Sequence, residues 1–314
     1  MKGIDILGVD NECGEKLGGS MRRSGILFII IILMIGAFAY SGEFSNFFWQ
    51  VEKGDVTVNL CGSVHFMKPD YYPLREEIEQ AFEESDVLVL EFDMNKIDMN
   101  KILELINSKG TYPEGESLKQ ALGEEYYAKL GSELAEYKYQ VETVKNQKPW
   151  YMTMTISSLR VSELGYTAEG GTDLYFAQKA KGTKEIEQLE TPESQFELLS
   201  SLDEKIQIKY LKDIIDKRKE FNQEVEELMQ SWIAGDDSTM YRLMSEELLE
   251  DPELIGFYEK LFTARNLKMA DKIEKYLTGD NEKEYFVVVG SGHYLGDDGI
   301  VNLLRERGYT IVRK

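Results

Sequence analysis

Two short apolar runs, residues 56–60 and 285–289, each lead through a Gly-Ser step to a histidine. The first continues as Gly-Ser-Val-His65 and the second as Gly-Ser-Gly-His293. Apolar runs of this length that are rich in β-branched residues are typical of strands buried on both faces of a parallel sheet. Ligands of α/β proteins bind at the carboxyl ends of such strands. The repeated pattern therefore predicts that both imidazoles lie at one functional edge of a sheet.

His65 and His293 are the only histidines of the chain. Imidazole is the one side chain that titrates near neutral pH without perturbation, and it is also the commonest metal ligand. We therefore expect the two histidines to act together in one site.

The segment that follows His65 predicts a βαβ unit. Residues 74–82 carry apolar side chains at helical spacing, and residues 87–91 form another apolar run, Val-Leu-Val-Leu-Glu. A βαβ unit implies parallel strands with a right-handed crossover, so we expect an α/β fold with a central, mostly parallel sheet. Glu91 then lies at the same edge as His65, as a metal ligand, a general base or a solvated acid at a strand end.

From residue 97 to about residue 280 the pattern is mostly that of amphipathic helices, which predicts a large helical insertion. Within it, residues 184–190 predict a short strand that ends in Glu190, either a second site carboxylate or a capping and turn residue. A charged helix carries Arg265 and Asn266, which either point into a cleft or cover its rim.

Composition narrows the class of protein. The chain of 314 residues has 57 Asp and Glu against 36 Lys and Arg, a formal net charge of −21. Such an acidic chain argues against nucleic acid as a partner, because that binding depends on cationic contacts to phosphates. Beyond residue 39 the only cysteine is Cys61, so a disulfide and a thiolate metal cluster are excluded there. Cys61 is expected to be a small buried thiol; pairing with His65 as a nucleophile is an alternative without the usual signature.

The N-terminal part resembles a targeting segment. Arg22 and Arg23 precede the apolar run 26–39, which ends in the small-x-small pattern Ala-Phe-Ala. Residues 21–43 therefore predict a signal peptide or an uncleaved signal-anchor, with a buried core helix as the alternative, and an extracytoplasmic body, secreted or anchored in the membrane, at 44–314. The aromatic patch at 47–49 would extend this segment or lie at the membrane interface. Met21 is an alternative start, which would make 1–20 an untranslated extension.

Common catalytic motifs are missing. The sequence has no P-loop, no Gly-x-Gly-x-x-Gly after a strand, no His-Glu-x-x-His helix and no Gly-x-Ser-x-Gly elbow. Ser63 and Ser291 each precede a histidine by two residues, so a serine nucleophile paired with the opposite histidine is an alternative.

In combination, six motifs resemble the TraB/GumN family, which includes PrgY and the animal Tiki proteases. The resemblance extends from Val56 to Val312. It rests on Gly-Ser-Val-His65, Val-Leu-Val-Leu-Glu91, Gly171-Thr172-Asp173, Leu189-Glu190-Thr191, Arg265-Asn266, and Gly-Ser-Gly-His293 with its downstream Gly-Asp-Asp-Gly turn. It implies a fold like that of erythromycin esterase, with two Gly-x-x-His motifs and a glutamate beside one cleft. It also implies a metal-dependent peptidase acting on a peptide or protein.

The chemistry of these side chains agrees with that implication. Two imidazoles and a carboxylate (His65, His293, Glu91) form an open ligand set for a divalent zinc, manganese or cobalt ion. Glu91 or Glu190 would accept the proton of an attacking water, and Arg265 would stabilise an oxyanion or bind a peptide carboxylate. We count Asn266 among the candidate catalytic residues. The alternative is a binding protein that captures a peptide signal or a metal without chemistry.

Overall fold

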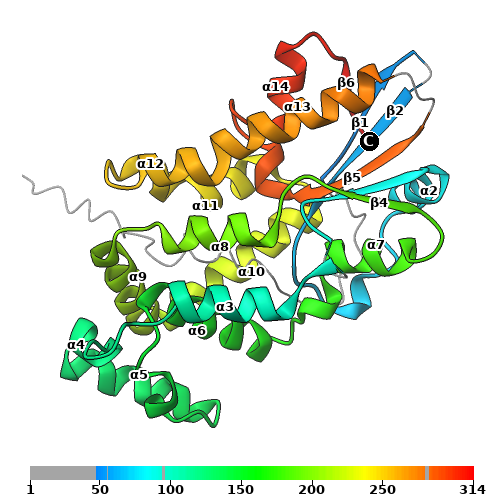
Figure 1. Cartoon of the computed structure of the whole chain (residues 1–314). Coiled ribbons are helices and arrows are strands. Elements are labelled where there is room, and N and C mark those ends of the chain that lie inside the picture. Colours follow the sequence, from blue (N-terminus) through cyan, green and yellow to red (C-terminus); the bar gives the residue numbers. More distant parts are fainter. Residues whose placement is uncertain (1–46, 55, 94–95, 280–282) are drawn as a thin grey trace, which may run out of the picture.

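The computed structural model describes residues 47–314, except residues 55, 94–95 and 280–282 (Figure 1). The predicted N-terminal extension, 1–20, and the predicted signal peptide or signal-anchor, 21–43, lie outside the described residues. In the part that is described, no helix combines the length and the apolar character that a membrane span requires.

Strands and helices alternate in the first part of the chain and helices follow. The strands are β1 (Phe48–Lys53), β2 (Val56–Ser63), β3 (Val87–Leu90), β4 (Glu185–Gln188), β5 (Tyr285–Gly290) and β6 (Ile311–Arg313). The α-helices are α2 (Glu76–Glu84), α3 (Met99–Lys109), α4 (Leu118–Leu122), α5 (Glu124–Glu136), α6 (Pro149–Glu163), α7 (Thr172–Ala180), α8 (Pro192–Ser200), α9 (Glu204–Asp216), α10 (Arg218–Ala234), α11 (Asp237–Glu250), α12 (Ile255–Tyr258), α13 (Ala264–Thr278) and α14 (Ile300–Glu306). Short 3₁₀ turns are η1 (Pro69–Tyr71), η3 (Val141–Val144), η4 (Ala168–Gly170) and η6 (Ser291–Tyr294), and η5 (Glu259–Thr263) is a π-helical turn.

The described residues form one six-stranded sheet in the order β4-β3-β5-β2-β1-β6. Strands β4, β3, β5 and β2 are parallel, whereas β1 is antiparallel to both of its neighbours. The prediction of an α/β fold with a mostly parallel sheet is confirmed. Strand β5 lies between β2 and β3, so the two strands of the predicted βαβ unit are not direct neighbours.

Strand β1 corrects one expectation. The aromatic residues Phe47, Phe48 and Trp49 neither extend the N-terminal apolar segment nor face a membrane; each is at most 3% exposed within the core. Their backbone pairs with β2, with Trp49 opposite Leu60. The aromatic patch is apolar because it is buried in the sheet.

Helices cover both faces of the sheet, as alternating side chains of β5 show. Tyr285 stacks on Tyr276 of α13 with ring centroids 4.3 Å apart. Its neighbour Phe286 points to the other face, against Phe82 of α2 and Phe176 of α7. In Figure 1, α13 correspondingly lies above the strands and α7 below them.

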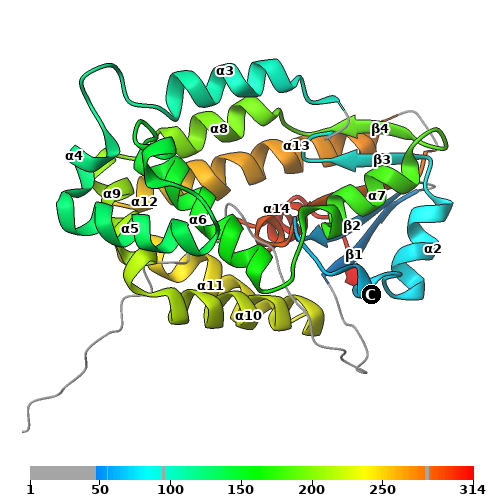
Figure 2. The ribbon, with the colours of Figure 1, turned by 90° about the horizontal axis from the view of Figure 1, so that it is seen from below.

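The predicted helical insertion is present between β3 and β5, interrupted by the short strand β4. Apart from α7 and α13, which cover the two faces of the sheet, Figure 2 shows these helices stacked beside the sheet. Within the insertion, α9 and α10 are separate helices, because Lys217 between them leaves the helical region of backbone dihedral angles. The insertion thus supplies a separate wall next to one edge of the sheet.

Candidate active site

The pairing of β2 with β5 brings the two histidines together. In the parallel register Ser63 lies opposite Gly290, the last residue of each strand. The Ser291 hydroxyl donates a hydrogen bond of 3.0 Å to the Ser63 carbonyl and joins the two turns. His65 and His293 therefore leave adjacent strand ends at the same edge of the sheet.

His65 is held by a carboxylate from the helical insertion. Its Nδ1 lies 2.7 Å from Asp173 Oδ2, and the Ser63 hydroxyl donates to the other oxygen, Oδ1, at 2.8 Å. Asp173 is in the first turn of α7, which docks on the same turn because Thr172 N–H donates to the Val64 carbonyl. Because a carboxylate accepts, Nδ1 carries the proton and Nε2 is turned away from Asp173.

His293 is held by an amide. Its Nδ1 lies 2.6 Å from Asn266 Oδ1, while Asn266 Nδ2 donates to the Asp298 carbonyl at 2.9 Å. The second bond fixes the amide orientation, so Oδ1 faces the imidazole and accepts from Nδ1. Tyr258 and Thr263 donate to the Asp298 carboxylate and anchor that turn.

The two anchors give the imidazoles different protonation states at neutral pH. Burial alone would lower the pKa of His65, but the Asp173 carboxylate outweighs it and raises that pKa to about 9. Burial, assisted by the Arg265 guanidinium, lowers the pKa of His293 well below its usual value of 6.5. At pH 7 His65 is an imidazolium and His293 a neutral imidazole with a lone pair on Nε2.

Glu91 is the hub of a buried ionic cluster. It is 4% exposed, and its Oε1 accepts from Gly290 N–H at 2.6 Å. Its Oε2 accepts from Gln195 and from Arg265 Nη2, both at 3.0 Å. Arg265 also binds Glu190 through Nε and Nη2 at 2.7–3.0 Å. One guanidinium therefore links two carboxylates that end neighbouring strands.

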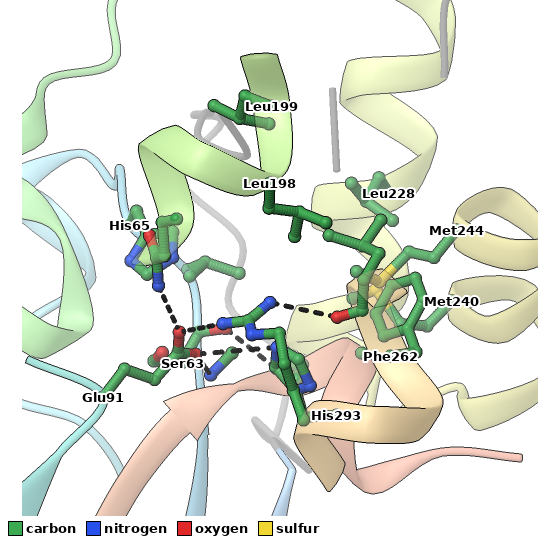
Figure 3. A pocket seen from close by; sticks show the side chains of 17 residues that line it. Ser63, His65, Glu91, Leu198, Leu199, Leu228, Met240, Met244, Phe262 and His293 are labelled. Carbon is green, nitrogen blue, oxygen red and sulfur yellow. Dashed lines mark hydrogen bonds and ion pairs between the residues drawn. The ribbon is translucent and has the colours of Figure 1, made fainter. Parts of the chain in front are cut away.

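These groups border one pocket with two distinct sides (Figure 3). Figure 3 shows Ser63, His65 and Glu91 on one side and Leu228, Met240, Met244 and Phe262 on the other. The polar lining consists of Ser63, His65, Glu91, Gln195, Arg265, Ser291 and His293. The apolar lining consists of Val64 beside His65 and, on the opposite side, of Leu198, Leu199, Leu228, Met240, Met244, Leu261 and Phe262.

The structure sorts the predicted site residues into two groups. His65, Glu91, Arg265 and His293 line the pocket. Glu190 and Asn266 are not among its lining residues and contact it through Arg265 and His293. Asn266 is fully buried, so it positions an imidazole instead of meeting a substrate.

Three groups in the site were not predicted there: Asp173, Gln195 and the apolar wall, by which we mean the leucines, methionines and Phe262 of the lining. Asp173 is part of the Gly-Thr-Asp motif, and its position one residue after Thr172 at a helix start was the available signal. Gln195 and the apolar residues have no signal in the sequence, because they belong to ordinary amphipathic helices.

The nucleophile alternatives find little support in the geometry. Across the described part of the chain, the Ser63 and Ser291 hydroxyls donate to Asp173 and to a backbone carbonyl, and neither donates to an imidazole. Cys61 is buried in the core, and burial raises the pKa of its thiol. A thiol with a raised pKa is a poor nucleophile.

The imidazoles fit a metal ion better than the carboxylate does. Each has Nδ1 bonded from behind and Nε2 left for a ligand, the arrangement usual for metal-bound histidine. His293 Nε2 lies 4.0 Å from Glu91 Oε1. Glu91 itself is engaged by three donors, and nowhere in the described ranges are three His, Cys, Asp or Glu side chains grouped as a metal site. The three residues predicted as metal ligands, His65, His293 and Glu91, therefore line one pocket, but they are not grouped closely enough to form a complete metal site.

Comparisons with known proteins give one family match. The model of the TraB/PrgY/gumN family matches residues 47–313, nearly all of the described chain. No solved structure matches the chain.

Curated relatives are distant. Metalloprotease TIKI1 of Danio rerio is 22% identical, with the alignment covering 86% of this chain and 63% of the relative. Metalloprotease TIKI2 of Xenopus tropicalis is 21% identical over 86% of this chain and 60% of the relative. Human metalloprotease TIKI1 is 19% identical over 86% and 62%. The chain thus spans about three fifths of the length of these relatives.

Proposed function

Because this chain belongs to the TraB/PrgY/gumN family, we propose that it is a metal-dependent peptidase, as the names of its Tiki relatives suggest. The observation that carries the proposal is the matched pair of imidazoles. Two strand-end histidines, each anchored at Nδ1, leave both Nε2 atoms to one pocket that also holds a buried carboxylate.

His65 and His293 would hold the ion through Nε2, with Glu91 as the nearest carboxylate. A bound zinc, manganese or cobalt ion would acidify a water and polarise a peptide carbonyl. Asp173 and Asn266 fix the ring orientations, and Arg265 holds Glu91 and Glu190 beside His293. Glu91 would take a proton, Arg265 would bind developing negative charge, and Glu190 would keep Arg265 in place.

The proposal is tested with the full-length chain, stripped by a chelator, reloaded with Zn²⁺, Mn²⁺ or Co²⁺ and incubated with a peptide library. We expect cleavage that needs the metal and is abolished by His65→Ala and by His293→Ala. Asp173→Ala and Asn266→Ala should lower activity or metal affinity by about 10- to 100-fold, the usual effect of removing a group that orients a ligand. Glu91→Gln should also lower the rate, because the amide cannot take the proton. Glu187→Gln is its matched control, because Glu187 lies on β4 outside the pocket and accepts from Tyr276.

Two outcomes would overturn the proposal. Stoichiometric peptide binding without turnover under every metal would favour a protein that sequesters a peptide or metal. Cleavage that survives the chelator and is lost in Ser63→Ala or Ser291→Ala would favour a serine hydrolase.

We also propose that the body is extracytoplasmic, secreted or anchored by residues 21–43, and that its fold is related to that of erythromycin esterase. The positive-then-apolar pattern of the N-terminus supports the first proposal, and the strand-end histidines of the parallel sheet support the second. Protease accessibility of the C-terminus in intact cells tests the location. An experimental structure tests the fold relationship.

A further inference from the structure

We propose that Gln195 contacts the substrate: one N–H of its side-chain amide holds Glu91, while its amide oxygen accepts a hydrogen bond from a backbone N–H of a bound peptide. The proposal rests on the proposed peptidase function. It assigns the recognition of a neutral peptide group to a side chain of the helical insertion.

The hydrogen bond to Glu91 fixes the orientation of the Gln195 amide. Gln195 lines the pocket from helix α8 and is partly exposed. Its Nε2 donates to Glu91 Oε2 at 3.0 Å. Because a carboxylate accepts hydrogen bonds, the nitrogen end of the amide must face Glu91. The amide oxygen, Oε1, is therefore turned away from that carboxylate oxygen.

The other polar side chains of the lining are already engaged. Arg265 donates to two carboxylates and to a backbone carbonyl. The hydroxyls of Ser63 and Ser291 donate to an aspartate and to a backbone carbonyl, and both imidazoles keep Nε2 for the proposed metal ion. Within the described residues, the Gln195 amide has no hydrogen bond besides that to Glu91. Its oxygen and its second N–H are thus left for a ligand.

The chemistry of the side chain indicates the chemistry of that ligand. A carboxamide offers a donor and an acceptor and carries no charge, as a peptide group does. Its oxygen favours a backbone N–H over an anion, because the oxygens of an anion only accept hydrogen bonds. The expected partner is therefore the backbone of a peptide, whatever side chains that peptide carries.

The start of α8 places Gln195 next to Glu91. Glu190 N–H donates to the Glu91 carbonyl at 2.7 Å, which continues the pairing of β3 with β4. Thr191 then caps α8, with its side-chain oxygen accepting from Ser194 N–H at 3.3 Å, and Gln195 follows directly. A peptide N–H bound at Oε1 would thus be held close to the carboxylate proposed to take the proton.

The test uses the full-length chain, stripped of metal by a chelator, and a blocked hexa-alanine peptide. In a set of analogues a single alanine is replaced by lactic acid, which turns one backbone N–H into an ester oxygen. Calorimetric titration should show one analogue that binds about 3- to 10-fold more weakly than the parent peptide, the usual effect of losing one hydrogen bond. In Gln195→Leu we expect the parent and that analogue to bind equally, within about twofold.

The comparison separates a direct contact from a structural role. If Gln195→Leu weakened the binding of all peptides by the same factor and kept the preference for the parent over that ester, the proposal would be overturned. Gln195→Met repeats the test in case the leucine variant does not fold. Gln223→Leu is the matched control, because Gln223 is exposed on α10 and is not part of the lining, so it should keep the wild-type preference.

Binding and turnover distinguish this inference from the peptidase proposal. An ester effect that depends on Gln195, without metal-dependent cleavage of any peptide, would support the contact and contradict the peptidase. Metal-dependent cleavage without such an effect would support the peptidase and contradict the contact. Failure of the parent peptide to bind the metal-free chain at millimolar concentration would also contradict the contact.

Discussion

Two histidines in equivalent sequence patterns have different electrostatic environments, because different groups hold their Nδ1 atoms. His65 faces the Asp173 carboxylate, whereas fully buried His293 faces the neutral Asn266 amide. The first environment stabilises an imidazolium and the second a neutral ring. A metal ion would have to displace a proton from His65 but not from His293.

A chain with two histidines permits a direct test by NMR titration of ¹⁵N-histidine-labelled, metal-free protein. We expect one imidazole to titrate near pH 9 and the other to stay neutral from pH 5 to 8, with its proton on Nδ1. Asp173→Asn should move the higher pKa down toward or below 6.5, because the opposite charge is removed. Two titrations near pH 6.5 in the wild type would contradict this assignment.

The His65–Asp173 pair should make the free energy of unfolding depend on pH. The pKa of His65 is higher in the folded than in the unfolded chain, so its stabilisation is full below pH 6.5 and is lost as pH rises through about 9. Urea unfolding of the wild type and Asp173→Asn should therefore differ most below pH 6.5 and converge above pH 9. Since His65 is about one third exposed, solvent screening makes this difference small.

Loss of Arg265 should be costly, because it is the cation that two enclosed carboxylates share. Arg265→Met leaves Glu91 and Glu190 buried without their cation, and we expect about 3–5 kcal/mol lower free energy of unfolding. Arg218→Met is a matched control: Arg218 also links two glutamates, Glu136 and Glu163, but at the surface, where such pairs contribute about 1 kcal/mol or less. Equal losses in denaturant unfolding would contradict the buried-cluster interpretation.

At the scale of elements, glycines and short turns determine how the helical insertion meets the sheet. The start of α7 approaches the His65 turn so closely that a Cβ at Gly171 would lie 2.3 Å from the His65 carbonyl oxygen. The π-helical turn η5 similarly places Phe262 on the pocket, and Arg265 Nη1 donates to the Leu261 carbonyl. Single π turns of this kind are frequent at functional sites.

Gly171→Ala should therefore separate α7 from the His65 turn. We expect a stability loss of about 1–3 kcal/mol and a lower pKa of His65, because Asp173 moves with the helix. Gly256→Ala in α12 is the control: its added Cβ meets nothing within 4 Å, so alanine should be neutral or stabilise by up to about 1 kcal/mol. Thermal unfolding and the histidine titration measure both effects, and an unchanged His65 pKa in Gly171→Ala would contradict the close approach.

At the scale of the whole molecule, the sheet joins the two ends of the described chain. Strand β6 pairs with β1, with Ile311 opposite Val51, so the last residues complete the sheet that begins at residue 48. The parallel strands β2, β3, β4 and β5 supply the functional edge, and the antiparallel pair β1 and β6 extends the sheet away from it. The site thus lies at the ends of the parallel strands, and β1 and β6 supply none of its residues.

This arrangement predicts that mutations in the outer strand β6 change the stability of the protein but not the geometry of the site. Ile311→Ala should lower the free energy of unfolding by about 2 kcal/mol, since Ile311 is 9% exposed, whereas Val312→Ala, at 50% exposed, should change it by less than about 0.5 kcal/mol. The pKa values of both histidines should remain unchanged in both variants. A shifted His65 pKa in Ile311→Ala would contradict the separation.

Strands β2, β3 and β5 and the residues at their ends were predictable, because these strands depend on local patterns. The runs that end before His65, Glu91 and His293 are apolar over five residues or so, which a strand buried on both faces requires. Strand β1 was missed because its aromatic residues follow an apolar segment and resemble a continuation of it. Periodicity cannot distinguish a membrane-facing aromatic residue from one that is buried against a neighbouring strand.

By itself, the sequence determined the α/β class, the family and the edge at which His65, Glu91 and His293 lie, since each follows from a contiguous motif. The tertiary structure alone decided what each of these groups contacts. Asp173, Asn266, Arg265 and the apolar wall reach the site from helices far away along the chain. Burial and charge depend on such distant neighbours. For this reason one histidine is charged and the other is neutral, and the pocket has an apolar side that no sequence motif predicts.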